Sequence, residues 1–535
     1  MDSLIVCPEP RAAKVGRDVL AQGGNAVDAA VAAAFAQAVV NPLQCGIGGT
    51  ALIYYYDARN HRRLALNAEA AIGSRPVPKC WAEEYAGQSG ATGRHVIRSE
   101  ANQLGYQSIM TPGFVRGCWT AFRRFGSRRI SWSDLLAPAH RLAVEGFEVY
   151  PYIAAMWQKL KGKPGYPGLL AKLRITPDAA RAYLKPDGSI YEEGDRLLQP
   201  DLARTIRRLA DAGGDDFYTG EIGLAISQDL ARHGAFTTPE DLQDYDVDQD
   251  RPLCGAYRGL EVTAPPFSFG AQFIGMLQVA EHFDLAGLRH NTPEYVDTLA
   301  RIQRASFAGS ARLEGMSREE ARPLERELIS YERAVAWAGR IKGGDRIAIS
   351  GAAAHHGTTH LTCIDADRNV VSFTHSIGSL AGSGVVTPGL GFLYNNFLGF
   401  FRPSAGSPDS IVPGKKIGGS MAAIIFKDGE PYIALGSPSS KSSTAAAQCV
   451  MNVVDHGMDM RTAVSVARFH SEAQQLITVE PQFSERSVQA LREMGNEVQR
   501  STDMGRVQAI LARPDTHELE AGPDPRGGAG AGRHP

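Results

Sequence analysis

The sequence lacks three features that would assign it to a large functional class: a net charge, a long apolar run and a paired-cysteine motif. Its 535 residues carry 56 Lys and Arg against 58 Asp and Glu, a net charge of −2. A nearly neutral chain offers no electrostatic basis for binding nucleic acid or an anionic membrane surface. The most apolar stretch, residues 26–40, is too short to span a bilayer and contains Asp28. We therefore expect neither a nucleic-acid partner nor a membrane partner.

The cysteines show no pairing pattern. Their number is odd, they are widely scattered, and no two form a C-x-x-C pair; they stand at positions 7, 45, 80, 118, 254, 363 and 449. This distribution is typical of reduced, buried thiols. Residues 1–14 contain a short apolar run, with neither a basic segment before it nor a signal-cleavage pattern. These observations predict a cytoplasmic protein.

The composition and the apolar spacing predict a globular chain with a large core. Hydrophobic residues make up 43% of the sequence and charged residues 21%. Asn25 can cap a helix over 26–40, and alternating apolar residues predict strands at about 50–56 and 63–68. From about 112 to 345 the apolar spacing is mostly that of helices.

Strand patterns return at residue 358. We expect helices at about 441–457 and 485–495, and strands within 359–365, 369–376, 391–396, 421–438 and 507–513. Residues 340–357 are small, polar and glycine-bearing, which predicts a mobile segment. The Pro- and Gly-rich tail, about 514–535, predicts disorder. Because strands gather toward both ends of the chain, the pattern predicts one α+β domain whose sheets need both ends.

The junction near residue 358 raises a chemical question. A run of Ala, Gly and His ends at Gly357, and a strand begins at once with Thr358 and Thr359. A threonine at a strand start is usually only a β-branched residue in its preferred place. Threonine can act as a nucleophile when its own α-amine is free to serve as the base. Either Thr358 is inert, or the chain cuts itself between Gly357 and Thr358.

Ten segments between about residues 5 and 512 carry a family resemblance. In order they are GGNAVDAAVAAA, GIGGTALIYYYD, TPGFVRG, DLLAPAHRLAVEGF, DFYTGEI, TTPEDLQDY, TAPPFSFG, TTHLTCIDADRNVVSFTHSIGSLAGSG, GFLYNN and ALGSPSS. Together they resemble the gamma-glutamyltransferase (gamma-glutamyl transpeptidase) family. The resemblance implies an N-terminal-nucleophile (Ntn) hydrolase fold, a four-layer αββα sandwich. It also implies a precursor that cleaves itself at Gly357–Thr358 into a large subunit, 1–357, and a small subunit, 358–535, which stay partners in one core.

The resemblance also implies catalytic roles. Thr358 matches the nucleophile, and after cleavage its free amine would act as general base. Ser376 matches the hydroxyl that orients the nucleophile, although an ordinary strand serine fits the same pattern. Ser439 and Ser440 match the loop whose backbone N–H groups form the oxyanion hole, where the family commonly has Gly-Gly. No cofactor and no metal are implied.

The residues that hold the γ-glutamyl amino-acid group in the family are replaced in this chain. Ala68 stands where the carboxylate-binding arginine is expected. The other replaced positions, which hold an amide, ammonium-binding groups and a serine pair in the family, are Gly378, Phe397, Phe400, Gly418 and Gly419. Losing charge-assisted contacts makes glutathione a poor candidate substrate. The sequence therefore predicts a divergent branch that acts on an intracellular small-molecule amide or acyl substrate.

Other polar residues near the reactive loops are candidates for substrate binding. We hypothesise that His375, Lys441, Lys415 or Lys416 receives an acidic group of an otherwise apolar substrate, although the lysines can equally be solvated surface charges. The non-glutamyl branch of the family includes cephalosporin acylases, oxamate amidohydrolases and enzymes of antibiotic pathways. An alternative is therefore a hydrolase that cleaves a C–C bond and releases an oxalyl-type fragment in antibiotic biosynthesis.

Three further interpretations belong to other functional classes. His355, His356 and His360 could ligate a metal, but no carboxylate or cysteine at a defined spacing accompanies them. A Ser–Lys amidase within 437–443 lacks the motif spacing that such chemistry needs. A non-catalytic relative that is never cleaved and serves as a scaffold stays open, because so many pocket residues differ. The intact T-T-H motif and Ser376 argue against the scaffold.

Overall fold

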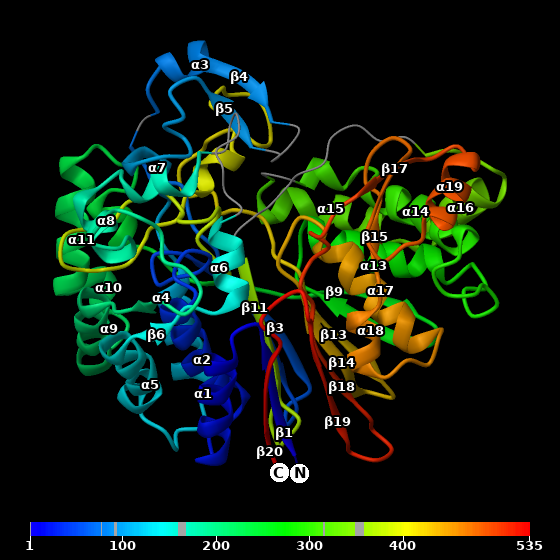
Figure 1. Ribbon diagram of the computed structural model, residues 1–535, viewed down its shortest axis with the longest axis horizontal. Coiled ribbons are helices and arrows are strands. Elements are labelled where there is room, and N and C mark those ends of the chain that lie inside the picture. The colour runs from blue at the N-terminus through cyan, green and yellow to red at the C-terminus, as the bar shows by residue number, and fades with distance from the viewer. Residues whose placement is uncertain (1, 76, 90–93, 159–166, 314–315, 348–357) are drawn as a thin grey trace.

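Two large antiparallel sheets pack against each other, layer on layer, through the centre of the molecule (Figure 1). The computed structural model describes residues 2–75, 77–89, 94–158, 167–313, 316–347 and 358–535. The first sheet has the strand order β20 (Gly530–His534), β1 (Ser3–Cys7), β11 (Thr358–Ile364), β12 (Val370–Ser376), β2 (Thr50–Asp57), β3 (Arg62–Ala68) and β8 (Asp248–Asp250). The second has the order β19 (Leu519–Pro523), β18 (Gln508–Ala512), β14 (Glu430–Gly436), β13 (Ala422–Lys427), β10 (Leu260–Ala264) and β9 (Leu253–Tyr257).

Helices flank the pair of sheets on both sides (Figure 1). Beside the first sheet are α1 (Pro10–Ala21), α2 (Ala26–Val40), α4 (Phe114–Phe125), α5 (Trp132–Glu145), α6 (Pro151–Gln158), α7 (Leu169–Leu173), α8 (Pro177–Tyr183), α9 (Pro200–Ala212), α10 (Asp216–Thr219), α11 (Glu221–Arg232) and α12 (Pro239–Gln243). Beside the second sheet are α13 (Ser268–Ala280), α14 (Pro293–Phe307), α15 (Arg318–Leu328), α16 (Tyr331–Lys342), α17 (Ser442–Val454), α18 (Met460–Ser465) and α19 (Glu485–Glu493).

Short elements complete the fold. They are α3 (Cys80–Glu84), the 3₁₀ turns η1 (Tyr106–Ser108), η2 (Ser310–Leu313) and η3 (Phe397–Phe400), and three small sheets made of β4 (Tyr85–Gln88) with β5 (His95–Ile97), β6 (Phe147–Glu148) with β7 (Arg196–Leu197), and β15 (Phe469–His470), β16 (Leu476–Val479) and β17 (Glu497–Arg500). A separate apolar cluster that includes Trp81, Ile97 and Phe397 joins α3, β5 and η3.

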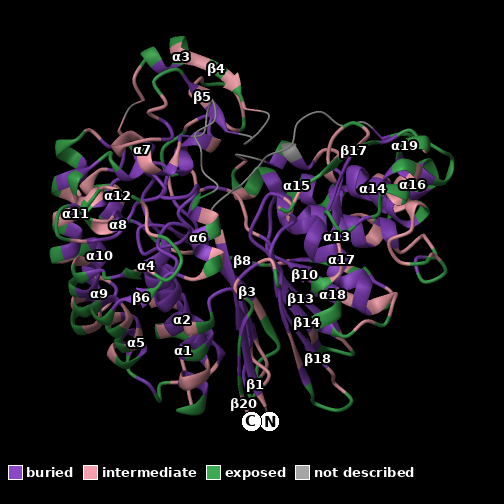
Figure 2. Cartoon of the chain, viewed as in Figure 1, coloured by how far each residue is buried: buried purple, intermediate pink, exposed green. Residues whose placement is uncertain are grey.

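Separate apolar clusters hold four layers together, as the sequence predicted. One cluster fills the space between the helices and the first sheet and includes Phe35 and Phe114. A second lies between the two sheets and includes Tyr54 and Phe426. A third packs the other helices on the second sheet. Figure 2 shows the buried residues concentrated in the sheets and the inner helices. The four-layer αββα sandwich is confirmed.

The predicted local signals explain the elements nearest the centre. The Asn25 side chain accepts hydrogen bonds from the N–H groups of Val27 and Asp28, which fixes the start of α2. Every residue of α2 is buried, because its small alanines allow close packing on β11 and β12. The hairpin of β11 and β12 is buried along nearly its whole length, since both faces of its sheet are covered. The predicted strands at about 50–56 and 63–68 are confirmed as β2 and β3.

One prediction of local structure was wrong and another was incomplete. Residues 391–396 form no strand; Tyr394 makes only an isolated bridge to Gly48. The mostly helical region from about 112 to 345 also supplies β9 and β10, two strands of the second sheet. Within the segment predicted to be mobile, 340–357, α16 extends to Lys342, and residues 348–357 lie outside the described residues.

The expectation of a disordered tail at about 514–535 was also wrong. This segment forms β19 and β20, and β20 pairs with β1 from Ser3↔His534 to Cys7↔Gly530. Its glycines reflect close packing rather than disorder. A Cβ on Gly530 would lie 2.7 Å from the Cys7 carbonyl oxygen, and one on Gly532 would lie 2.6 Å from that of Ala13. The chain ends therefore lie together at one end of the sheets (Figure 1).

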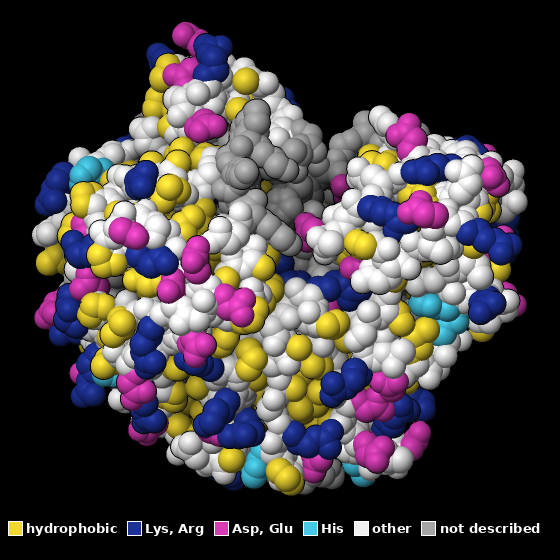
Figure 3. Space-filling model, in the orientation of Figure 1, with side chains coloured by type: hydrophobic (Ala, Val, Ile, Leu, Met, Phe, Trp, Pro, Cys, Tyr) yellow, Lys and Arg dark blue, Asp and Glu magenta, His cyan; other side chains and the backbone are white. Residues whose placement is uncertain are grey.

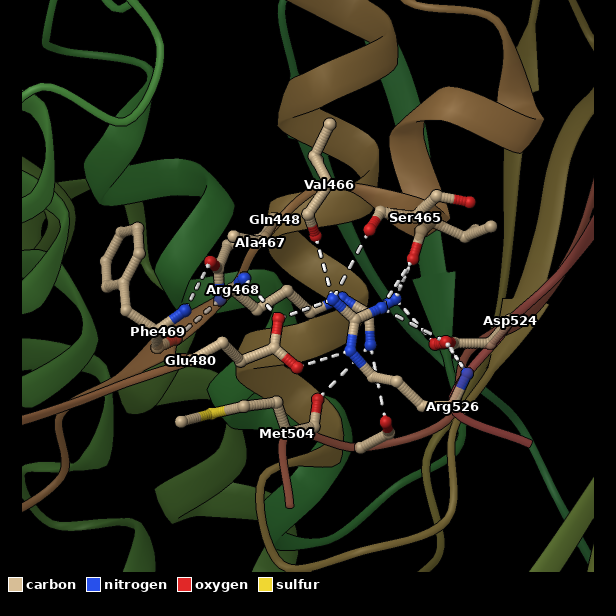
Figure 4. Close-up of polar contacts among 12 residues, drawn as sticks. Gln448, Ser465, Val466, Ala467, Arg468, Phe469, Glu480, Met504, Asp524 and Arg526 are labelled. Atoms are coloured by element: carbon tan, nitrogen blue, oxygen red, sulfur yellow. Dashed lines mark hydrogen bonds and ion pairs between the residues drawn. The ribbon is translucent and has the colours of Figure 1, made fainter. Parts of the chain in front are cut away.

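A buried charge network fastens the tail to the second sheet and α18 (Figure 4). The Asp524 carboxylate accepts a hydrogen bond from Arg468 Nη2 at 2.6 Å and one from the Val507 N–H at 2.8 Å. Arg526 binds Glu480 and donates to the backbone carbonyls at the end of α18. Asp524 and Arg468 are almost completely inaccessible to solvent. Because each buried charge is paired, the tail is part of the core.

The surface carries no dominant charge on the face that Figure 3 shows, where Lys and Arg side chains alternate with Asp and Glu. Among the described residues, no helix combines the length and the apolar character needed to cross a membrane. All seven cysteines have free thiols, and five of them are buried.

Candidate active site

Three hydroxyl side chains stand in one row across the end of the first sheet. Thr358, the first residue of β11, pairs with Ser376 at the end of β12, and Ser376 pairs with Thr50 at the start of β2. The Thr358 hydroxyl donates a hydrogen bond to Ser376 Oγ at 3.1 Å. Ser376 Oγ also accepts one from the Gly378 N–H at 2.9 Å. These contacts hold the Thr358 hydroxyl in a defined direction.

Arg506 fixes the backbone of Thr358. Its Nη2 atom donates to the Thr358 carbonyl oxygen at 3.2 Å and to Gln44 Oε1 at 3.3 Å. The Arg506 N–H donates to Ser437 Oγ at 3.0 Å, which ties it to the loop after β14. Sequence reasoning missed this positioning residue, because it lies almost 150 residues after Thr358 in an unremarkable loop.

The loop 437–442 brings backbone N–H groups to the row of hydroxyls. Ser439 has a φ of 118°, which is a strained conformation for a residue with a Cβ. Its hydroxyl accepts a hydrogen bond from the Lys441 N–H at 3.2 Å. Among the described residues, the N–H groups of Ser439 and Ser440 have no acceptor. They are thus available as hydrogen-bond donors, and the family resemblance implies that they form the oxyanion hole.

Glu69 is a buried acid in the same site, and sequence reasoning missed it as well. Its carboxylate accepts hydrogen bonds from the hydroxyls of Thr50 and, at 3.2 Å, Ser420. The side chain is 2% exposed. Burial raises the pKa of Glu69 to about 7, although the two hydroxyls and the charge of Lys416 partly oppose that shift. The residue follows Ala68 directly, inside the motif that drew attention to Ala68.

These groups line one small cavity of about 40 Å³. Its lining residues are Thr50, Glu69, Phe269, Thr358, Thr374, Ser376, Gly378, Phe397, Ile417, Gly419, Ser420, Met421, Ser437, Pro438, Ser439 and Ser442. An engineered cavity of about 150 Å³ holds benzene, so the enclosed part of this site has room for only a few atoms. No lysine or arginine occurs among its described lining residues.

Of the replaced family positions, three line the cavity, and Phe400 and Gly418 do not. Gly378, Phe397 and Gly419 form part of the wall. The Phe400 ring instead stacks on the buried Arg94 guanidinium at 4.2 Å, and Gly418 lies beside Phe267. Gly378 has a φ of 95° and lies against Asn396, so a residue with a side chain would be strained there.

The structure does not bring His375 to the cavity. Successive strand residues point to opposite faces, so His375 faces α2 while Thr374 and Ser376 face the cavity. Its Nε2 atom lies 2.9 Å from Gln37 Oε1, and Gln37 in turn donates to the buried carboxylate of Glu9. Burial lowers the pKa of His375 to about 3. The neutral ring packs between β12 and α2 and has no route to a substrate in this cavity.

The predicted lysines also point elsewhere. The Lys441 ammonium donates to the Asp503 carbonyl oxygen at 2.5 Å and lines a separate, larger cavity of about 640 Å³ beside β16 and β17. Lys415 donates to the Pro408 carbonyl oxygen, and Lys416 pairs with Asp248 at 2.9 Å. None of these ammonium groups contacts a described serine hydroxyl, which leaves the Ser–Lys amidase without its base.

The described residues offer no metal site. They contain no group of three or more His, Cys, Asp and Glu side chains placed to hold an ion. His360 is fully buried between the sheets, where its ring nitrogens contact the hydroxyls of Thr374 and Thr362. His355, His356 and the cleavage-site residue Gly357 lie outside the described residues.

The raised pKa of Glu69 leads to a prediction about stability. The pKa of Glu69 is 4.5 in the unfolded chain and about 7 in the folded protein. The protonated side chain therefore makes its full contribution to the free energy of unfolding below pH 4.5. That contribution is lost as the pH rises through 7. Because a tenfold change in proton affinity corresponds to about 1.4 kcal/mol, the loss is about 3 kcal/mol in total. Glu69→Gln should therefore gain about 3 kcal/mol relative to wild type between pH 4.5 and pH 8.

Urea unfolding of the two chains at both pH values measures this gain. It is best done in a Thr358→Ala background, so that a single chain unfolds. The matched control is Glu221→Gln, which alters a side chain that is 75% exposed and should track the wild type. Parallel pH profiles for Glu69→Gln and wild type would contradict a buried, protonated Glu69.

Comparison with known proteins points to one family. The model for gamma-glutamyltranspeptidase matches residues 12–533. The acylase ACY 1 proenzyme of Pseudomonas sp. (strain SE83) is 32% identical over 534 residues, covering 96% of this chain and 90% of that protein. The glutathione hydrolase proenzyme of Bacillus subtilis (strain 168) is 28% identical, with coverages of 95% and 87%. A solved cephalosporin acylase from Bacillus halodurans has the same fold, with a TM-score of 0.84 at 24% identity over 99% of this chain and 95% of that one.

Proposed function

The chain belongs to the gamma-glutamyltranspeptidase family of Ntn hydrolases, and from this premise we propose that it is a self-processing threonine hydrolase for a small-molecule amide or acyl substrate other than glutathione. The observation that carries the proposal is the placement of Thr358. Its hydroxyl, the orienting Ser376 and Ser439 of the loop with two free N–H groups line one cavity.

The maturation step uses the same hydroxyl. Thr358 Oγ attacks the carbonyl carbon of Gly357, the C–N bond breaks, and an ester links Gly357 to Thr358. Water then hydrolyses the ester, which leaves a carboxylate on Gly357 and a free amine on Thr358. The subunits 1–357 and 358–535 stay together, because β11 remains paired with β1 and β12 with β2 in one sheet.

In the mature enzyme, one residue supplies both nucleophile and base. The free amine of Thr358, whose ordinary pKa is near 8, takes the proton of the hydroxyl as Oγ attacks the acyl carbonyl. The N–H groups of Ser439 and Ser440 stabilise the oxyanion that forms. Collapse expels the leaving group with the proton and forms an acyl ester on Thr358, and water or an amine then receives the acyl group.

Two observations support a substrate other than glutathione. The described lining residues contain no cation that could pair with the α-carboxylate of a glutamyl group, and Phe397 occupies an ammonium-binding position of the family. The similarity to an acylase proenzyme at 32% identity agrees with a broader acyl specificity. The free thiols support our proposal of a cytoplasmic site of action. A role in secondary metabolism with C–C bond cleavage stays a prediction from the family resemblance.

The acyl-enzyme is the species that tests this function. Mixing the protein with a set of neutral acyl p-nitroanilides and quenching in acid should increase the mass of the 358–535 chain by one acyl group. Peptide mapping should place the acyl group on Thr358. Ser376→Ala should slow acylation without changing where the acyl group is attached. Release of p-nitroaniline with no mass increase, or acylation at another residue, would contradict the proposal.

A further inference from the structure

Glu69 lies at the far end of the row that begins at the nucleophile. Thr358, Ser376 and Thr50 are direct neighbours on three adjacent strands, and the Thr50 hydroxyl donates to the Glu69 carboxylate. Adjacent strands are about 4.8 Å apart, so Thr50 lies about two spacings from Thr358. An acyl chain that is held by its carbonyl at Thr358 can therefore extend over Ser376 and end at Glu69.

The carboxylate of Glu69 has room for one more partner. It receives hydrogen bonds from Thr50 and Ser420, which use two of about four acceptor positions. Its neighbours in the wall, Phe397, Ile417 and Met421, are apolar and offer no competing donor. A ligand atom that donates a hydrogen bond would find an acceptor here.

The charges around the cavity disfavour substrates that carry a carboxylate. Among the described lining residues, Glu69 is the one titratable side chain. Lys416, whose charge acts on Glu69, is engaged by Asp248 and by the Asp246 carbonyl oxygen. At the Glu69 end, about two strand spacings from the Thr358 amine, a substrate carboxylate would thus face another carboxyl group in a desolvated site, which is costly. A donor group at the same place would be stabilised.

We propose that Glu69 is the specificity-determining residue of this site and selects acyl groups that end in a hydrogen-bond donor, such as an amine, and carry no carboxylate. The inference rests on the proposed function, since it assumes that Thr358 receives the acyl group. It places the chain apart from enzymes that remove oxalyl-type fragments, because an oxalyl group carries a carboxylate.

Three p-nitroanilides of equal chain length test the selection. The 4-aminobutyryl, pentanoyl and glutaryl compounds end in an ammonium, a methyl and a carboxylate group. In the wild type, kcat/KM should be highest for 4-aminobutyryl, lower for pentanoyl and lowest for glutaryl, with about 100-fold or more between the extremes. Glu69→Gln should reduce that ratio below about 10-fold. The matched control Glu221→Gln should keep the wild-type order.

The possible outcomes distinguish failure of this inference from failure of the proposed function. If pentanoyl p-nitroanilide acylates Thr358 but the glutaryl compound is turned over as fast as the 4-aminobutyryl compound, the inference is overturned and the function stands. If no anilide acylates Thr358, the proposed function fails. Calorimetry of the wild type with 4-aminobutyramide, pentanamide and glutaramate then decides the inference alone: tightest binding of the amine supports it, and equal or no binding overturns it.

Discussion

Thr358→Ala should lower kcat/KM by about 10⁴-fold or more on any substrate the protein turns over, because the change removes the attacking atom. The neighbouring hydroxyl of Ser376 is held by hydrogen bonds from Thr358 and from the Gly378 N–H. Thr358→Ser keeps a hydroxyl and an amine at the same place, so it should retain cleavage and measurable turnover. Stopped assays over hours compare the three proteins.

The fold must stay intact for that comparison to be meaningful. The Thr358 hydroxyl contacts Ser376 at the end of the first sheet, so the circular dichroism spectrum of Thr358→Ala should match that of the wild type. Turnover by Thr358→Ala within about tenfold of the wild type would show that the nucleophile lies elsewhere.

Asp524→Ala should lower the free energy of unfolding by about 3–5 kcal/mol, because it leaves Arg468 buried without its counter-ion. The loss also removes the acceptor of the Val507 N–H, next to the residue that fixes the nucleophile, Arg506. Urea unfolding in the Thr358→Ala background measures the change on a single chain.

The exposed pair formed by Asp2 and Arg533 provides the control. It also involves a residue of the tail, but its side chains are 38% and 49% exposed. Asp2→Asn should therefore change the stability by no more than about 1 kcal/mol. Equal effects of Asp524→Ala and Asp2→Asn would mean that the tail is not part of the core.

Local signals made most of the fold predictable. The cap at Asn25, the alternating residues of β2 and β3 and the β13–β14 hairpin are encoded within a few residues, and they formed as expected. The prediction of a disordered tail was wrong because the strands of the tail are rich in Gly and Ala, which have low strand propensity. Pairing with β1 and β18 and the buried Asp524 decide its structure, and those contacts join residues far apart in sequence.

The residues of the candidate site likewise include some that a local motif identifies and others that only long-range contacts bring together. Thr358 and Ser376 were found because each lies within a recognisable motif. The substrate-binding prediction for His375 could have been rejected from the sequence, since a strand that turns Ser376 toward a cavity turns His375 away. Glu69 and Arg506 could not be assigned, because their positions near Thr358 depend on strand register and on the loop between β17 and β18.

Self-cleavage is the claim on which the account depends, and intact-mass measurement tests it most directly. Wild-type protein of 57.5 kDa should give two chains of about 38 and 19 kDa, with Thr358 at the N-terminus of the smaller one. Thr358→Ala should stay whole. A wild-type preparation that remains a single 57.5 kDa chain while it turns over substrate would contradict the account, because Thr358 would then lack the free amine on which the mechanism depends.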